Sequence, residues 1–285
     1  MRWLGSRHEN ILTLRDLYVE FYFHTNRSFF LRPTLTNTHR YLYPGHDEIY
    51  LVLPLFDTDL HRVIQSKQKL SPAHVAHFMR QILSGIDFIH RAGVLHRDLK
   101  PGNLLVNRDC HLVLADFGLA RVKESRDNRP MTHHVVTRWY RPPELILNPD
   151  GMYGTAVDVW SVGCIFAELL GRKPLWPGKD QVQQLQLIFQ TLGSPERSQI
   201  GHIRNNDGRR FLRSLPFYPA KRFRDVYPKV KSKHAIDLLT RFLKFVPDDR
   251  VTVLEALNHA YVSSNIFVDS SRLYIHNTHT HTQVL

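Results

Sequence analysis

Two short polar clusters between residues 96 and 118 hold the side chains best suited to chemistry. They are His96-Arg97-Asp98, with Lys100 and Asn103 close behind, and Asp116-Phe117-Gly118. Carboxylate and amide oxygens are the ligands that hard cations such as Mg²⁺ prefer, and a carboxylate can also orient or accept a proton. Two apolar runs, Leu104–Val106 and Leu112–Ala115, separate the clusters and predict a small hairpin that brings them together.

The order H-R-D-L-x-x-x-N followed by D-F-G resembles the catalytic loop and the metal-binding loop of protein kinases. The resemblance implies that Asp98 orients or accepts the proton of a substrate hydroxyl and that Lys100 lies beside the transferring phosphate. It also implies that Asn103 and Asp116 bind Mg²⁺, which bridges the phosphates of ATP. A polar loop with solvated charges is the weaker alternative, because both motifs occur in the order typical of kinases.

Residues 53–59, LPLFDTD, fall where a kinase joins its two lobes. The resemblance implies that Leu53 is the gatekeeper of the nucleotide site and that the backbone of Pro54 and Phe56 meets adenine. It places Asp59 near the ribose and Leu105 beneath the base. The same apolar side chains would also suit an ordinary core.

Residues 135–145, VVTRWYRPPEL, resemble the substrate-binding end of the activation segment in cyclin-dependent and mitogen-activated kinases. By this resemblance, Thr137 hydrogen-bonds to Asp98 and Lys100. Arg138 and Arg141 match two arginines that organise a pocket for protein substrates with Ser/Thr-Pro sites.

A regulatory site is expected just upstream. Thr132 stands where the mitogen-activated group has Thr-x-Tyr, and His134 replaces the tyrosine. Phosphate on Thr132, added by an upstream kinase, is expected to be bound by Arg97 and Arg121. The missing tyrosine predicts a single-site switch, and a plain loop role for His134 is favoured over pH sensing.

Apolar periodicity predicts a helix from Ser71-Pro72 to Gly93 and a fully buried helix over residues 156–170. Asp158 interrupts the second helix, and a buried carboxylate needs hydrogen-bond donors. The resemblance implies that the backbone amides of the His-Arg-Asp loop supply them, and that Glu144 pairs with Arg250 in a buried position. Further helices are predicted around 235–245 and 251–258.

Residues 1–56 are interpreted as a remnant of the smaller lobe, with strands near 7–17 and 48–53. Between them, residues 18–47 show no clear period and are predicted to be an irregular insertion; a functional insertion, disorder and an error in the chain all stay open. No lysine precedes Lys67, and only Gly5 and Gly45 precede the lobe junction. The glycine-rich loop and phosphate-contacting lysine of kinases therefore have no counterpart here.

The expected fold is α+β and protein-kinase-like, with a truncated small-lobe sheet, a mainly helical large lobe over 57–262 and a low-complexity His/Thr-rich tail over 263–285. The tail's imidazoles could bind a transition metal, but low-complexity composition is the better explanation. The net charge of +12 fits an acidic partner, yet no aromatic-basic nucleic-acid motif accompanies it, so solvated faces are favoured.

The sequence has two cysteines, no apolar run long enough to span a membrane and no apolar signal core. These features predict an intracellular protein, in the cytoplasm, the nucleus or both, that does not bind membranes. We also expect a monomer. The function that the resemblance implies is transfer of the ATP γ-phosphoryl group to serine or threonine, before proline, in signalling like that of mitogen-activated kinases. The alternative is a catalytically weak fragment or a pseudokinase that acts as a binding module. The absent lysine is the feature that bears on this choice.

Overall fold

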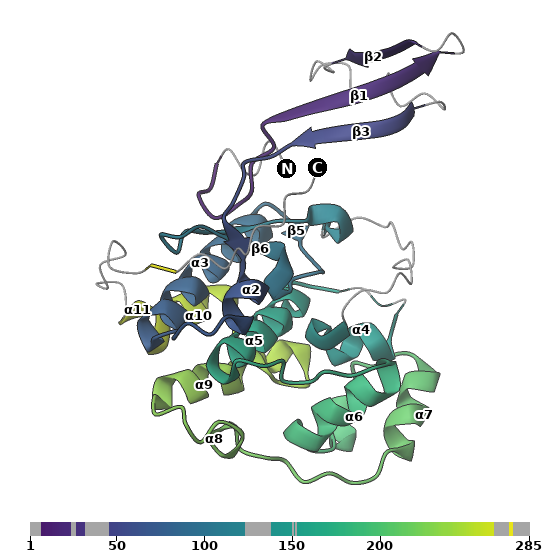
Figure 1. Ribbon diagram of the computed structural model, residues 1–285. Coiled ribbons are helices and arrows are strands. Elements are labelled where there is room, and N and C mark those ends of the chain that lie inside the picture. Colours follow the sequence, from purple (N-terminus) through teal and green to yellow (C-terminus); the bar gives the residue numbers. More distant parts are fainter. Residues whose placement is uncertain are drawn as a thin grey trace.

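A computed structural model describes residues 7–23, 27–31, 46–122, 138–149, 151, 153–264 and 274–275. Figure 1 shows a small antiparallel sheet above a larger, mainly helical body. Within the described part of the chain, no helix is long and apolar enough to cross a membrane.

The small sheet has the order β2-β1-β3, formed by β1 (Asp16–Phe23), β2 (Arg27–Leu31) and β3 (His46–Val52). The strand expected over 48–53 corresponds to β3. The prediction of irregular structure throughout 18–47 is wrong for the stretches that form β1 and β2. In β1, Val19, Phe21 and Phe23 alternate with more polar neighbours and supply β-branched and aromatic residues, which favour a strand.

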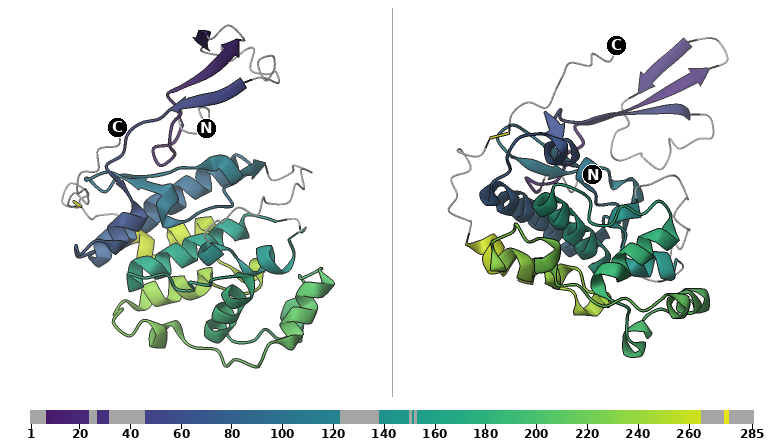
Figure 2. Two further views of the ribbon diagram at one scale, coloured as in Figure 1. Left: turned by 45° about the vertical axis from the view of Figure 1, so that its right-hand side comes forward. Right: turned by 60° about the horizontal axis from the view of Figure 1, so that its bottom comes forward.

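The larger body follows in chain order. It comprises β4 (Thr58–Asp59), α2 (Leu60–Gln65), α3 (Pro72–Arg91), β5 (Val94–Leu95), η2 (Pro101–Asn103), β6 (Leu104–Val106), β7 (Leu112–Leu114), η3 (Phe117–Leu119), β8 (Arg121–Val122), η4 (Arg138–Tyr140), α4 (Pro143–Leu147), α5 (Ala156–Gly171), α6 (Gln181–Leu192), η5 (Arg197–Ile200), α7 (Asn206–Ser214), α8 (Phe223–Val226), α9 (Lys233–Phe242), η6 (Pro247–Asp249), α10 (Val253–Asn258) and α11 (Ala260–Ser263). Figure 2 shows α3 and α5 running through the middle of this body. Beyond α11, the histidine-rich part of the tail lies outside the described residues.

Helix α3 begins and ends where its sequence predicts. The Ser71 hydroxyl accepts from the His74 amide, a proline occupies the first turn, and Gly93 follows the helix with a positive φ of 73°. Because Ser71 supplies an acceptor to an otherwise unpaired amide, it fixes the start of the helix. The apolar face of α3 packs on α5, which is buried on nearly every side, as expected.

The core between these helices is aromatic at several points. The rings of Trp160 and Trp176 stack with centroids 5.3 Å apart, and Phe166 contacts both Phe242 and Tyr261. Trp160, Phe166 and Phe242 are all fully buried. Large buried rings such as these contribute much of the hydrophobic stabilisation of a domain.

The start of the described chain is attached to β7 through a buried polar network. Asn10 donates to the Leu112 carbonyl at 2.8 Å and to Gln81 Oε1 at 3.1 Å. Gln81 in turn donates to the Cys110 carbonyl and accepts from the Leu112 amide, both at 2.8 Å. Where a short strand was expected within 7–17, the chain forms an isolated bridge between Ile11 and Leu114 before β1 begins.

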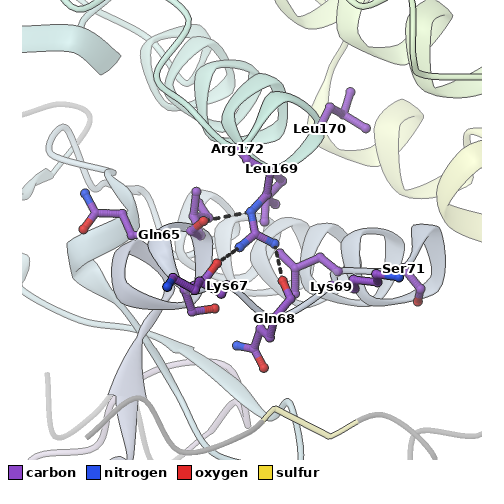
Figure 3. A pocket seen from close by; sticks show the side chains of 11 residues that line it. Gln65, Lys67, Gln68, Lys69, Ser71, Leu169, Leu170 and Arg172 are labelled. Atoms are coloured by element: carbon purple, nitrogen blue, oxygen red, sulfur yellow. Dashed lines mark hydrogen bonds between the residues drawn. The ribbon is translucent and has the colours of Figure 1, made fainter. Parts of the chain in front are cut away.

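Arg172 ties the end of α2 to the end of α5 (Figure 3). Its guanidinium donates to the backbone carbonyls of residues 63, 64, 66 and 68 at 2.5–3.2 Å. The last carbonyls of a helix have no partner within the helix, so this side chain satisfies groups that would otherwise need water. Arg172 does this from a left-handed backbone conformation, with φ at 58°.

Arg172→Ala is expected to lower the free energy of unfolding by about 1.5–3 kcal/mol, because charge-assisted hydrogen bonds to buried carbonyls are lost. Arg172→Gly should lower it less, since glycine adopts a positive φ without the penalty of about 1–2 kcal/mol that a Cβ brings. Urea unfolding of both variants is the measurement, with exposed Lys173→Ala as the control. Equal stability of the Arg172→Ala and Lys173→Ala proteins would contradict the capping role.

Candidate active site

Asp98, Lys100 and Asn103 lie together at the start of β6. Lys100 Nζ lies 2.8 Å from Asp98 Oδ2, and the Asn103 amide donates to the same oxygen at 3.1 Å and to the Asp98 carbonyl at 2.8 Å. The Asp98 side chain keeps only 10% of its surface exposed. The carboxylate is therefore fixed by two donors rather than free to rotate.

Asp116 reaches the same region from the end of β7. Its backbone is left-handed, with φ at 59°, and its Oδ1 accepts from the Gly118 amide at 3.3 Å. A Cβ on Gly118 would lie 3.1 Å from that oxygen, so glycine permits this tight turn. The amide of Ala115 donates to the Asn103 carbonyl at 2.9 Å, which places Asp116 beside Asn103.

His96 connects the two loops, a role that the sequence analysis did not assign. Its Nδ1 accepts from the Asp98 amide at 3.4 Å, and its Nε2 lies 3.0 Å from the Ala115 carbonyl. Burial lowers the pKa of His96, so the ring is neutral with its proton on Nε2. The ring also contacts Phe117, with centroids 4.9 Å apart. The position of His96 within the H-R-D motif is the sequence feature that could have predicted this role.

Asp158 holds the backbone of the His-Arg-Asp loop from α5. Its carboxylate accepts from the amides of His96 at 2.9 Å and Arg97 at 2.8 Å, and His90 Nε2 lies 2.8 Å away. Full burial opposes ionisation, but the hydrogen bond and charge of His90 and the Arg97 amide together hold the pKa of Asp158 below its usual value. The donors expected for this buried carboxylate are present. Arg97 accordingly keeps a positive φ of 68°.

Glu144 and Arg250 form a buried pair beneath the site. The two guanidinium nitrogens of Arg250 donate to the two carboxylate oxygens of Glu144 at 2.6 and 2.7 Å. Arg250 also donates to the carbonyls of Lys244, Ala156 and Phe245, and it lies over the Trp160 ring at 4.8 Å. Such a pair fixes α4 against α5 and the segment before α10, because each charge has several partners.

Four arginines, Arg97, Arg121, Arg138 and Arg141, lie close to one another beside Asp98. Burial lowers the pKa of Arg97, and the charge of Arg121 lowers it further. Burial likewise lowers the pKa of Arg141, and nearby Asp98 opposes that effect. Arg138 is another neighbour of Arg141. The buried Nε atoms of Arg97, Arg121 and Arg141 have no hydrogen-bond partner among the described residues. Thr132 and Thr137 lie outside the described part of the chain.

Of the residues predicted to meet the nucleotide, Asp59, Leu105 and Phe56 lie together near the pairing of β4 with β6, whereas Leu53 and Pro54 follow the small sheet. Asp59 and Leu105 are register partners in the pairing of β4 with β6. Phe56 and Leu105 pack against a small apolar cluster of Leu12, Val113 and Ala115. Asp59 also accepts from the Arg62 amide at 2.9 Å, which starts α2. Leu53, by contrast, is 38% exposed at the end of the small sheet, and Pro54 is half-buried.

The oxygen atoms around Asn103 and Asp116 fit a magnesium ion. The Asn103 nitrogen is engaged with Asp98, so its Oδ1 is the atom left to ligate a cation. Asp116 is exposed and presents a carboxylate. In the described chain no three His, Cys, Asp or Glu side chains form a closed metal cage, and Mg²⁺ typically takes its remaining ligands from phosphates and water.

Asp158→Asn is expected to lower the free energy of unfolding by at least about 2 kcal/mol, because an amide cannot accept from all three donors and each unsatisfied buried donor costs about 1–3 kcal/mol. The pKa of Asp158 is depressed in the folded protein, so its contribution is present above the unfolded pKa and is lost as pH falls through the folded pKa. The variant should therefore lose part of the acid dependence of stability.

Urea unfolding between neutral and acidic pH tests this, with Asp225→Asn as the control. Asp225 pairs with Arg222 at an exposed position, so its loss should change stability by less than about 1 kcal/mol. Similar effects of the two substitutions would show that Asp158 does not hold the loop.

Comparison of the sequence with known proteins identifies a family that has the same motifs. The protein kinase domain family matches residues 3–262. Mitogen-activated protein kinase homolog NTF3 of Nicotiana tabacum is 48% identical over 257 residues, which cover 90% of this chain and 63% of the relative. Mitogen-activated protein kinase 7 of Arabidopsis thaliana is 47% identical over 257 residues, 90% of this chain and 64% of the relative. Mitogen-activated protein kinase 5 of Oryza sativa subsp. indica is 45% identical over 255 residues, with 90% and 63% covered.

The chain thus spans about 63% of the length of the curated relatives it matches. The family match confirms the kinase-like α+β fold expected from the two motifs. The chain belongs to the protein kinase domain family and is similar, over most of its length, to mitogen-activated protein kinases.

Proposed function

We propose that this chain, completed by a full small lobe, transfers the γ-phosphoryl group of ATP to serine or threonine in proteins, with a preference for sites followed by proline. The observation that carries the proposal is the fixed Asp98 carboxylate, held by Lys100 and Asn103 beside Asp116. Phosphoryl transfer depends mainly on positioning and on electrostatic stabilisation. These large-body residues, called the lower wall of the site below, supply both from one side of the phosphates; the small lobe would form the upper wall.

When bound, a magnesium–ATP complex supplies the phosphoryl group and part of the charge neutralisation. Asp98 orients the substrate hydroxyl and accepts its proton, for which its immobilised carboxylate is suited. Lys100, already 2.8 Å from Asp98, provides a positive charge next to the transferring group. Asn103 and Asp116 provide the oxygen ligands for the metal.

The nucleotide and substrate lie on opposite sides of these residues in the proposal. Leu105 supports the base, Asp59 lies near the ribose, and the backbone of Pro54 and Phe56 with the Leu53 side chain borders adenine. The packing of Phe56 and Leu105 in one cluster supports this placement. Arg138 and Arg141, with Thr137, form the pocket for a Ser/Thr-Pro segment, and the proximity of Arg141 to Asp98 supports that assignment.

We also propose that an upstream kinase regulates the chain at Thr132. The charge of nearby Arg121 lowers the pKa of Arg97, and a doubly negative phosphate would offset this repulsion. Their buried Nε atoms, without partners among the described residues, could then donate to phosphate oxygens.

One observation favours a second function, that of a weak kinase or pseudokinase that acts by binding. No lysine precedes Lys67, so the cation that normally faces the phosphates from the small lobe is absent from this sequence. The end of β3 is also open, since Tyr50, Leu51 and Val52 are each at least 40% exposed. The lower wall of the site is complete in the proposal, and the upper wall is not.

The 285-residue chain is expected to be slower than a version that carries a complete mitogen-activated-kinase small lobe by at least about a hundredfold in kcat. Loss of one preorganised charge contact commonly costs a factor of about 10²–10³, and the covering loop is absent as well. Phosphate transfer to a Ser-Pro peptide is measured for both chains. The completed chain should use the Ser-Pro peptide at least about tenfold better than a matched Ser-Ala peptide.

Asp98→Asn in the completed chain should lower kcat by at least about 10². The control is Asp109→Asn, since Asp109 is exposed on the β6–β7 turn and lies outside the proposed site. Comparable turnover by the short and completed chains would refute the need for an upper wall. Full activity of Asp98→Asn would refute the catalytic assignment, and inactivity of the completed chain would favour the binding function.

Phosphorylation of Thr132 is expected to slow proteolysis of residues 121–137 at least about tenfold, because arginine–phosphate contacts order the segment. Limited proteolysis of the full chain, with and without phosphothreonine at 132, measures this. Arg121→Gln should abolish most of the protection, whereas Arg224→Gln, an exposed position on α8, should leave it unchanged. Equal cleavage of the two phosphorylation states would count against the switch.

A further inference from the structure

Residues 204–233, called the basic edge below, hold most of the chain's excess positive charge. The stretch contains ten lysines and arginines and only two acidic residues, Asp207 and Asp225, so it carries +8 of the net charge of +12. Arg209 is half-buried, and the other nine cationic side chains are exposed. The two aspartates pair with Arg210 and Arg222, and the remaining cations of the stretch make no ion pair with a described carboxylate. The charge is thus concentrated in one stretch rather than spread over all solvated faces.

The basic edge lies at one end of the large body. Figure 1 shows the chain passing from α7 through a long connection to α8 and on to the start of α9, at the end of the body farthest from the small sheet. The left view of Figure 2 shows the same connection along the bottom of the molecule. The candidate active site lies toward the small sheet, so a partner bound at the basic edge would leave that site open.

Helix α7 presents its arginines from a fixed backbone. It approaches α4 so closely that a Cβ added to Gly208 would collide with the Leu147 carbonyl. On the same side of α7, Leu212 belongs to a buried apolar cluster. Arg210 and Arg213 are exposed, and residues three apart share one face of a helix. The cations on this face therefore stand on a helix whose other side is firmly packed.

The connection between α7 and α8 holds an exposed aromatic ring. The Ser194 amide donates to the Tyr218 carbonyl and the Tyr218 amide donates to Ser194 Oγ, both at 2.9 Å. The Lys221 amide donates to the Thr191 carbonyl at 2.9 Å. These bonds fix the connection to the end of α6, yet the Phe217 side chain is 82% exposed. One exposed ring is ordinary by itself, but this ring is held in place among clustered cations.

The remainder of the basic edge is anchored in the main core. Phe223 and Tyr227 on α8 are 5% and 8% exposed and belong to the main hydrophobic cluster. Arg224 between them is exposed, as are Lys229 and Lys231 just beyond. Because the backbone carrying these cations is already ordered, its ordering adds little to the entropy cost of binding a partner.

We propose that the basic edge binds the anionic surface of a lipid bilayer, with its lysines and arginines against acidic headgroups and the Phe217 ring inserted between them. Attraction to acidic lipids adds up over clustered cations. An apolar side chain that enters the headgroup layer adds buried area, which strengthens attachment independently of charge. The proposal is independent of phosphoryl transfer, since none of these residues belongs to the candidate active site.

The form of the basic edge favours a bilayer over a nucleic acid. Single-stranded nucleic acid is usually bound in a groove in which several aromatic side chains stack on bases. Phe217 is the only exposed aromatic side chain between residues 204 and 233, all of which the structure describes. A broad anionic surface, by contrast, can contact cations from α7 to the start of α9 at once. The expectation that the chain does not bind membranes rested on the lack of long apolar runs, which surface attachment does not need.

Sedimentation of the full 285-residue chain with lipid vesicles tests this surface. The chain should bind vesicles of phosphatidylcholine with roughly one-third phosphatidylserine at least about thirtyfold more tightly than vesicles of phosphatidylcholine alone, and added salt should weaken the binding. The combined variant Arg213→Gln, Lys221→Gln and Arg224→Gln should bind the acidic vesicles at least about thirtyfold more weakly. Phe217→Ala should weaken binding at least about fivefold, because the inserted ring is lost.

The matched control is a second triple variant, Lys67→Gln, Lys69→Gln and Arg80→Gln, which removes the same charge from exposed positions outside the basic edge. Its affinity for acidic vesicles should change by less than about threefold. Urea unfolding of both triple variants should match that of the unchanged chain, because all six side chains are exposed.

Four results would overturn the proposal. They are equal binding to the two kinds of vesicle, equal loss of binding in the two triple variants, undiminished binding of Phe217→Ala, and preference for nucleic acid over lipid. The last is measured by competition: single-stranded DNA that displaces the chain from acidic vesicles at an equal concentration of phosphate groups would assign the basic edge to nucleic acid instead.

Discussion

The geometry of the His-Arg-Asp loop depends on one buried negative charge. Asp158 is fully buried on α5, and its two oxygens accept from the backbone of His96 and Arg97. An isolated buried carboxylate is strongly unfavourable, so its donors must stay in place. The requirement fixes the backbone at Arg97 in a left-handed conformation, and the direction in which Asp98 leaves the loop follows from it. The most buried charge thereby determines the position of the proposed catalytic one.

Burial also determines how His96 links this loop to the Asp116-Phe117-Gly118 loop. His96 is neutral because it is buried, and a neutral imidazole has one donor and one acceptor. It uses the acceptor for the Asp98 amide and the donor for the Ala115 carbonyl. Protonation of His96 would replace the acceptor with a second donor and break the link to Asp98. Because burial opposes that protonation, the link between the loops persists near neutral pH.

Features determined by residues within one segment could be predicted from the sequence, whereas contacts between residues far apart in the chain could not. Helix α3 could be predicted because its cap, its proline, its apolar period and its terminal glycine all lie within the segment. The donors of Asp158 could be anticipated because a buried carboxylate needs partners and the resemblance to kinases implied which backbone amides supply them. By contrast, Arg172 and Ile275 act through carbonyls more than a hundred residues away, and no local pattern predicts such contacts. Strand β1 was missed for a different reason: most of it lies within residues 18–47, a stretch interpreted as having no clear period.

The two walls of the site differ in how they are stabilised. The Glu144–Arg250 pair and the aromatic core belong to the large body, and the buried polar network joins that body to Asn10, which precedes β1. Among the described contacts, those that fix Asp98, Asn103 and Asp116 are made within the large body. These side chains of the candidate site are therefore positioned by hydrogen bonds within the large body. Preorganised charge accelerates a reaction only when it surrounds the group whose charge changes in the transition state. The contacts of Asp98, Asn103 and Asp116 hold their oxygen atoms in position from one side, so the proposed phosphoryl transfer also requires charge on the opposite side of the phosphates.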